Sequence, residues 1–125
     1  MNTDVMIDLE TLDTLPTTVV LSIGIVEFNP QKGIVDTERG LCLYPDIQEQ
    51  LDAGRTISAS TLEWWMKQSD EARKNTFNVR RKSINETCEN IRNFFSFMDR
   101  PKAWGNGSVF DITIIENFME YTKVP

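Results

Sequence analysis

The sequence predicts a single α/β domain over residues 1–125, with a three-stranded antiparallel meander, flanking helices and one crossover strand parallel to the first strand. Three observations lead to this prediction. Runs rich in β-branched residues and joined by short turns come first, helix-capping patterns follow, and a short apolar run then precedes a last helix. With 40% hydrophobic and 26% charged residues, the composition is that of a globular domain with a modest core.

The meander is predicted from four segments. Residues 1–9 have the apolar spacing of a first strand. Residues 19–28 are almost continuously apolar, which is typical of a central strand covered on both faces. A turn over residues 29–33 ends in glycine and sends residues 34–44 back antiparallel. The charges in this last run predict an edge strand.

Helices are predicted from residue 46 onward. A short helix is expected over residues 46–53, and the capping box Ser-Thr-Leu-Glu at residues 60–63 predicts the start of another. A second capping box at residues 83–86 begins an amphipathic helix, because apolar residues recur after it in steps of three and four. Its predicted inner stripe consists of Ile84, Cys88, Ile91, Phe95 and Met98.

The C-terminal part is predicted to contain a strand at residues 102–104 and a final helix. Between them, Gly105-Asn106-Gly107 allows the backbone to turn tightly or to approach a ligand closely. Asp111 is expected at or near the N-terminus of the helix. The predicted inner face of this helix carries Ile112, Ile115 and Met119.

Charge and cysteine content exclude several classes of protein. The net charge of −6 argues against a protein that coats nucleic acid by bulk electrostatics, and the lack of histidine removes the commonest general base. Cys42 and Cys88 stand far apart without a CxxC pattern, so neither a zinc site nor a disulfide framework is expected. No apolar run is long enough to cross a bilayer and the N-terminus lacks a basic leader, so we expect a cytoplasmic protein with no membrane partner.

Two segments admit two interpretations each. Residues 73–82 hold five of the 13 basic residues, either as a solvated charge run, which is the commoner case, or as a patch for a phosphate backbone. Trp64 and Trp65 are neighbours on a predicted helix and cannot both face the same layer. One is expected to pack in the core, and the other is either ordinary surface or a stacking platform.

The principal candidate for a functional site is Asp8-Leu9-Glu10. In a strand, Asp8 and Glu10 share one face while their apolar neighbours point to the other. Adjacent carboxylates repel each other unless a cation or hydrogen-bond donors compensate, which indicates a metal site; a solvated edge strand is the alternative. If the crossover strand pairs with the first strand, Asp111 joins the pair, and three hard oxygen ligands suit Mg²⁺ or Mn²⁺.

These residues resemble a known family. Ile7-Asp8-Leu9-Glu10-Thr11 is similar to the first motif of the DEDD superfamily of 3′-to-5′ exonucleases. Trp-Gly-Asn-Gly-Ser-Val-Phe-Asp at residues 104–111 is similar to the second motif, and residues 61–73 resemble the phage and prophage branch, called exonuclease VIII-like or exoribonuclease-like. The resemblance covers residues 4–122.

The resemblance implies a ribonuclease H-like fold and hydrolysis of terminal phosphodiester bonds at the 3′ end of single-stranded DNA or RNA, with release of nucleoside monophosphates. Asp8, Glu10 and Asp111 would carry catalysis by holding two Mg²⁺ or Mn²⁺ ions, with Asp8 bridging both. The residues expected to contact the substrate are Thr11, Leu12, Trp65 and Asn106.

The sequence departs from the family pattern at its C-terminal end. The third motif, with a fourth carboxylate and a histidine or tyrosine base, would lie beyond Pro125, and so would the fifth strand and closing helix. We therefore expect a C-terminally truncated domain with an exposed sheet edge, exposed apolar surface and impaired catalysis.

Two other functions stay open. One is a catalytically silent module that binds nucleic-acid ends or a partner protein through the same cleft. The other is a phospho-acceptor domain, against which the early meander argues, because that class needs a mostly parallel sheet. The oligomeric state is open as well, a homo-oligomer included.

Overall fold

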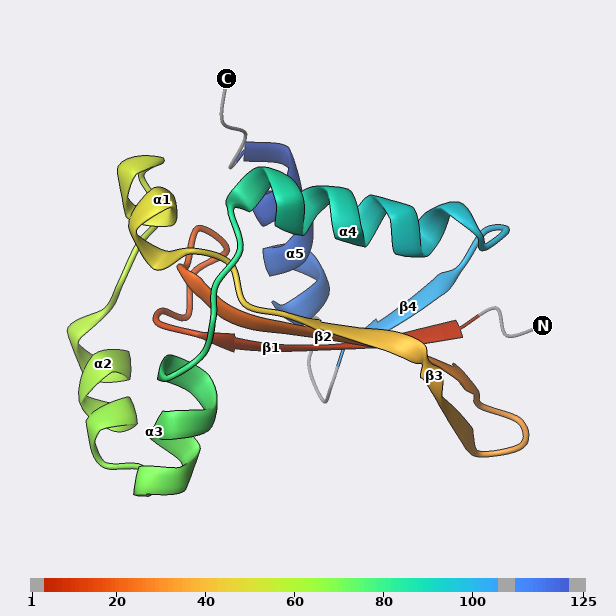
Figure 1. Cartoon of the computed structure of the whole chain (residues 1–125), viewed down its shortest axis with the longest axis horizontal. Coiled ribbons are helices and arrows are strands. Elements are labelled where there is room, and N and C mark those ends of the chain that lie inside the picture. The colour runs from red at the N-terminus through yellow and green to blue at the C-terminus, as the bar shows by residue number, and fades with distance from the viewer. Residues whose placement is uncertain (1–3, 106–109, 122–125) are drawn as a thin grey trace.

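The computed structural model describes residues 4–105 and 110–121 of the chain. Four strands of the described residues form one sheet in the order β3-β2-β1-β4 (Figure 1). The strands are β1 (Asp4–Thr11), β2 (Val20–Asn29), β3 (Ile34–Leu43) and β4 (Lys102–Gly105). The helices are α1 (Ile47–Asp52), α2 (Ala59–Met66), α3 (Asp70–Phe77), α4 (Ile84–Ser96) and α5 (Phe110–Tyr121).

The strand pairing confirms the predicted meander and the crossover. β1 pairs antiparallel with β2, and β2 pairs antiparallel with β3. β4 returns from the helical segment and pairs parallel with β1, with Gly105 opposite Ile7. The mixed α/β class is therefore confirmed, and β3 lies at one edge of the described sheet as expected.

The turn between β2 and β3 follows from its residue types. The Asn29 side-chain oxygen accepts hydrogen bonds from the backbone N–H groups of Gln31 and Lys32. Gly33 then adopts a φ of 65°, a left-handed conformation that glycine adopts without steric cost. The chain can therefore reverse within a few residues and return as β3.

Each of the first four helices begins at a side-chain cap. Asp46, Ser58, Ser69 and Ser83 each accept a hydrogen bond from a backbone N–H in the first turn of α1, α2, α3 and α4. The prediction that residues 60–63 form the cap of α2 is wrong, because Ser58 is the cap and binds the N–H of Thr61. Serines at both positions compete for this role, and the earlier one has the extended backbone that a cap requires.

The main core lies between the sheet and the helices α4 and α5, which Figure 1 shows on the same side of it. Ile84 and Ile91 of α4 and Phe118 of α5 are at most 1% exposed, so the predicted stripe of α4 is confirmed in this part. A smaller core cluster is separate from the main core. It consists of Leu12, Val19, Leu21 and Trp65.

β2 is covered on one face over most of its length, which corrects the expectation of burial on both faces. From Leu21 onward buried and half-buried residues alternate, and Ser22, Gly24 and Val26 lie on the face away from α4 and α5. A nearly continuous apolar run usually indicates two covered faces. Here serine and glycine occupy alternate positions, so the second face carries little apolar surface that must be buried.

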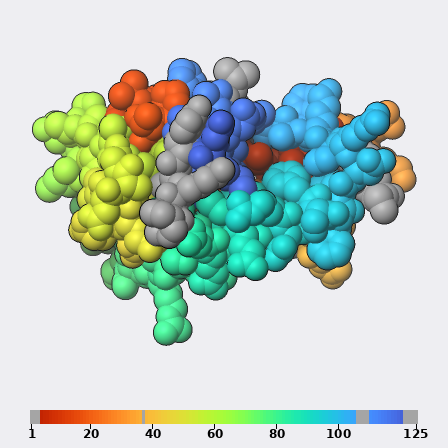
Figure 2. Space-filling model, turned by 90° about the horizontal axis from the view of Figure 1, so that it is seen from above, coloured from red at the N-terminus to blue at the C-terminus, as the bar shows by residue number. Residues whose placement is uncertain are grey.

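The buried face of α5 is rotated relative to the prediction. Ile114, Ile115 and Phe118 are buried, whereas Ile112 and Met119 are only half-buried. Those last two side chains line an open apolar groove of about 450 Å³ between α4, α5 and β4. Figure 2 shows this hollow, with atoms of β1 at its floor.

The groove lies beside β4, which is the other edge of the described sheet. Within residues 4–105 and 110–121, no helix is both long and apolar enough to cross a bilayer.

Candidate active site

β1 places Asp8 and Glu10 on one face of the sheet. Val5, Ile7 and Leu9 alternate with them and are buried in the main core. Asp8 is exposed and Glu10 is half-buried, on the face away from that core. The predicted division of this strand into an apolar and an acidic face is therefore confirmed.

The alternative of a solvated edge strand is wrong, because β1 lies between β2 and β4. The pairing with β4 ends at Ile7 and Gly105, one residue before Asp8. Asp8 and Glu10 therefore lie just beyond the end of the short parallel strand, on the side from which the chain continues toward α5.

Asp111 reaches the same place from the first turn of α5. The pKa of Glu10 is raised above its usual value of 4.5, first by burial and then by the negative charges of Asp8 and Asp111. Both neighbours therefore lie near enough to Glu10 to oppose its ionisation. The structure thus places Asp8 and Asp111, two of the three carboxylates predicted as catalytic and metal-binding, within electrostatic reach of the third, Glu10.

Within residues 4–105 and 110–121, neither Asp8 nor Glu10 forms a salt bridge. The salt bridges among the described residues join Arg39 with Glu27, Arg73 with Asp70, and Lys82 with Glu86, and none involves either strand carboxylate. Two neighbouring carboxylates such as Asp8 and Glu10 repel each other, and a bound divalent ion would relieve the repulsion.

The donor chemistry of the three carboxylates fits a hard cation such as Mg²⁺ or Mn²⁺. Their arrangement is not preformed for it: in the part of the chain that the structure describes, no group of three or more acidic or cysteine side chains is already disposed to hold a metal ion. A cation would therefore have to draw the side chains of Asp8, Glu10 and Asp111 together.

The end of β1 is held by its own loop. Thr11 is half-buried, and its hydroxyl donates a hydrogen bond to the backbone oxygen of Asp13. Leu12 is only 3% exposed and packs in the smaller core cluster, so its side chain is not available to a substrate in this conformation. The substrate contacts predicted for Thr11 and Leu12 both stay predictions.

The two adjacent tryptophans separate as expected. Trp65 is 5% exposed and its ring contacts those of Trp64 and Phe77 edge to face. Burial leaves little of the Trp65 ring open to a base in this conformation, and the predicted contact of Trp65 with the substrate, as a wall or by stacking, stays a prediction. Its indole N–H donates to the backbone oxygen of Thr11 at 2.9 Å, so Trp65 holds the end of the acid-bearing strand.

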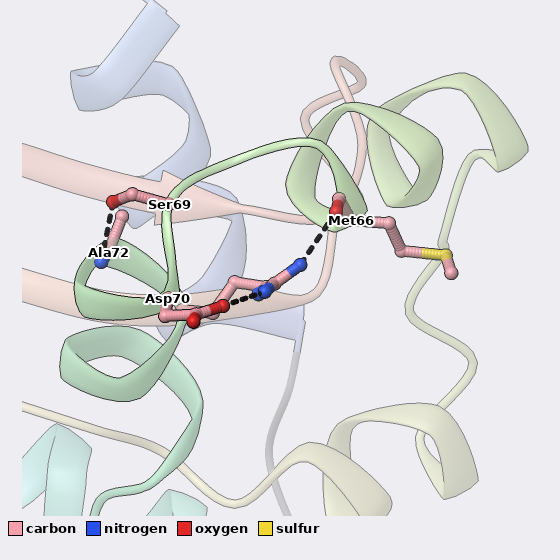
Figure 3. Close-up of polar contacts among 5 residues, drawn as sticks. Met66, Ser69, Asp70 and Ala72 are labelled. Carbon is pink, nitrogen blue, oxygen red and sulfur yellow. Dashed lines mark hydrogen bonds and ion pairs between the residues drawn. The ribbon is translucent and has the colours of Figure 1, made fainter.

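The basic segment at residues 73–82 is partly used for structure. Arg73 donates to the backbone oxygen of Met66 and pairs with Asp70, while Ser69 caps α3 through Ala72 (Figure 3). Arg81 donates to backbone oxygens of β2, of the segment before α1 and of α3. These contacts favour a structural role over a phosphate-binding patch. Asn106, predicted to contact the substrate, lies outside the described residues.

Arg55 is an important residue that no sequence pattern indicates. It is 7% exposed, and burial lowers its pKa to about 10. It donates to the backbone oxygens of Thr18 and Pro16 and to the side-chain oxygen of Asn117. Arg55 thereby joins the loop after β1 to the helix that carries Asp111. An isolated arginine after a glycine turn gives no sequence signal of such a role.

Comparison with known proteins assigns the chain to a family by its sequence. A solved structure of cell-death related nuclease 4 (CRN-4) matches 84% of this chain and 36% of that chain at 9% identity, with a TM-score of 0.43. The exodeoxyribonuclease of Enterobacteria phage T4 is 28% identical over 124 residues, which cover 90% of this chain and 53% of the phage protein. The chain thus spans about half the length of that relative. Residues 3–125 match the family described as the 3′-5′ exoribonuclease Rv2179c-like domain, and the chain therefore belongs to that exonuclease family.

Proposed function

We propose that the chain is a metal-dependent 3′-to-5′ exonuclease on a ribonuclease H-like fold, acting on single-stranded DNA or RNA and releasing nucleoside monophosphates. The observation that carries this proposal is that Asp8 of β1 and Asp111 of α5 both lie within electrostatic reach of Glu10, just beyond the end of the β1–β4 pair. The exonuclease family to which the chain belongs supports it independently.

Asp8, Glu10 and Asp111 are the residues that would hold Mg²⁺ or Mn²⁺. The bound ions would lower the pKa of the attacking water and neutralise charge on the phosphoryl group and on the leaving 3′ oxygen. Without them the three carboxylates would repel a phosphodiester, so substrate and cation should bind together.

Side chains of the chain would have two further roles in this proposal: to restrain the strand that carries Glu10 and to accept the proton of the attacking water. Trp65 restrains the backbone at Thr11 and thereby limits the positions that Glu10 can adopt. The chain has no histidine, so the proton of the attacking water would pass to a carboxylate or to solvent.

A silent module that binds nucleic-acid ends is the second candidate. It is favoured by the absence, among the described residues, of a three-ligand group already arranged for a metal ion. Cleavage and binding have to be measured separately in order to choose between the two functions.

The test uses 5′-labelled single strands of DNA and RNA with Mn²⁺, followed on a sequencing gel. Progressive shortening from the 3′ end that Asp8→Asn abolishes would support the proposal. Asp99→Asn is the matched control, because it removes an exposed carboxylate in the turn after α4, and it should cleave like the wild type. Binding of the strand without shortening would favour the silent module. Equal cleavage by Asp8→Asn would overturn the assignment of the site.

A further inference from the structure

Arg55 lies where the loop between β1 and β2 meets α5. The next residue along the chain, Thr56, donates its backbone N–H to the backbone oxygen of Thr17 at 2.9 Å. Ser58 likewise donates its backbone N–H to the backbone oxygen of Leu12 at 2.9 Å. Both acceptors belong to the loop that leaves the acid-bearing strand, so the backbone at Arg55 is held against that loop.

The Arg55 guanidinium crosses from this loop to α5. On the loop side, its Nε donates to the backbone oxygen of Thr18 at 2.7 Å, and one terminal nitrogen donates to the backbone oxygen of Pro16 at 2.8 Å. The other terminal nitrogen donates to the side-chain oxygen of Asn117 on α5 at 2.9 Å. A buried planar guanidinium with several fixed acceptors has little freedom to reorient. The side chain is therefore a rigid link between the loop and the helix.

Arg55 also restrains the rotation of α5 about its own axis. The guanidinium carbon lies 5.5 Å from the centre of the Phe118 ring, and Phe118 is fully buried in the main core. Asp111 precedes Phe118 by about two helical turns, so both side chains lie on the same side of α5. A rotation of the helix that moved the Phe118 ring away from the guanidinium would turn Asp111 away from Glu10 by the same angle.

The position of α5 matters because the carboxylates are not yet arranged for a metal ion. Among the described residues, no group of three or more acidic or cysteine side chains is already disposed to hold one. A cation therefore has to draw Asp111 toward the carboxylates of β1. If the backbone of α5 is fixed, a change of side-chain rotamer is enough, whereas a helix that is free to shift or rotate must also be ordered, which weakens binding.

We propose that Arg55 is a positioning residue of the exonuclease, which holds α5 where Asp111 can share a divalent cation with the carboxylates of β1. It acts through Asn117 and Phe118 rather than by contact with the cation. An arginine suits this role because its planar fork reaches the loop and the helix at once, which the point charge of a lysine cannot do. This inference rests on the proposed function for the identity of the cation site.

The test measures Mn²⁺ binding by titration calorimetry and, on the same proteins, the free energy of unfolding in EDTA. Asn117→Ala removes the acceptor on α5 and leaves the loop contacts of Arg55 in place. It should remain folded and bind Mn²⁺ about ten-fold more weakly, which is the lower end of the loss expected when a residue that supports a metal site is removed. Asn117→Asp keeps an acceptor oxygen and should recover most of the affinity. Asn85→Ala is the matched control, since it removes an exposed asparagine of α4, and it should bind Mn²⁺ like the wild type.

Arg55→Lys is the second variant, because it keeps the charge and removes the planar fork. It should weaken Mn²⁺ binding as Asn117→Ala does. In cleavage assays the defect of both variants should shrink as the Mn²⁺ concentration rises, because the restraint acts on cation binding. A purely structural defect would lower cleavage at every Mn²⁺ concentration and would overturn the positioning role.

The outcomes separate this inference from the proposed function. Wild-type Mn²⁺ affinity in Asn117→Ala and Arg55→Lys, with wild-type binding that Asp8→Asn abolishes, would overturn the positioning role and leave the proposed function standing. Equal loss of affinity in Asn117→Ala and Asn117→Asp would overturn it as well. Weakened affinity that Asn117→Asp recovers, without cleavage by the wild type, would support the positioning role and count against the exonuclease. A wild type that binds no Mn²⁺ would refute both.

Discussion

Replacing Glu10 by glutamine should stabilise the metal-free protein at neutral pH. The Glu10 carboxyl is half-buried beside Asp8 and Asp111, and its pKa is raised by burial first and by both charges second. A carboxyl whose folded pKa lies above its unfolded value stabilises the fold while protonated and loses this contribution as the pH rises through the folded pKa. Glutamine keeps the shape of the side chain without the charge.

The size of the effect can be worked out from the strand geometry. Asp8 and Glu10 are two residues apart on one face, about 6.7 Å, which corresponds to about 0.6 kcal/mol of repulsion in bulk water and about 2.5 kcal/mol at an effective dielectric constant of 20. Because Asp8 is exposed, screening favours the lower part of this range, and we expect a gain of about 1 kcal/mol. For a domain of this size the melting temperature should then rise by about 4 °C.

The assay is thermal unfolding of the wild type and Glu10→Gln in EDTA from pH 3.5 to pH 8. The stabilisation should be full above the raised pKa of Glu10 and should disappear as the pH falls below that pKa, because the wild-type carboxyl is then protonated in the folded protein too. Mn²⁺ at ten times its dissociation constant should stabilise the wild type by about 1.4 kcal/mol and Glu10→Gln by less.

Glu89→Gln, an exposed carboxylate on α4, is the matched control and should change neither curve. A Glu10→Gln protein that is less stable than the wild type in EDTA at pH 7 would refute the reasoning, because the cluster would then hold the fold together rather than strain it.

Three further substitutions test the parts that position the site. Phe118→Ala should lower the free energy of unfolding by about 3–5 kcal/mol in urea titrations, because Phe118 is 0% exposed, and a loss below about 1 kcal/mol would contradict its place in the core. Gln50→Ala should lower the free energy of unfolding by about 1–3 kcal/mol in the same titration, because the buried Gln50 amide forms hydrogen bonds with both the backbone N–H and the backbone oxygen of Val20. An unchanged urea midpoint would show that water replaces these two hydrogen bonds. Ser83→Ala should cost about 1 kcal/mol through loss of the α4 cap, measured by circular dichroism melting, and Ser83→Thr, which keeps the hydroxyl, should recover most of that loss.

Several features of the fold could be predicted because they depend on residues close together in the chain. The alternation of apolar and acidic residues in β1, the turn at Asn29 and Gly33, and the cap of α4 at Ser83 all appear as predicted. The cap of α2 shows the limit of such local patterns. Ser58 and Ser60 both suit a cap, and the backbone conformation at Ser58 decided between them.

The sequence by itself determined the acidic face of β1, the meander and the position of Asp111 at the start of a helix, because strand alternation and helix capping are local properties of the chain. Only the tertiary structure decided what surrounds these residues. It buried Trp65 and exposed Trp64, left the second face of β2 open, and placed the charge of Arg55 between the β1 loop and α5. The physical reason is that burial depends on which layers pack against which face, and contacts between distant segments set that packing.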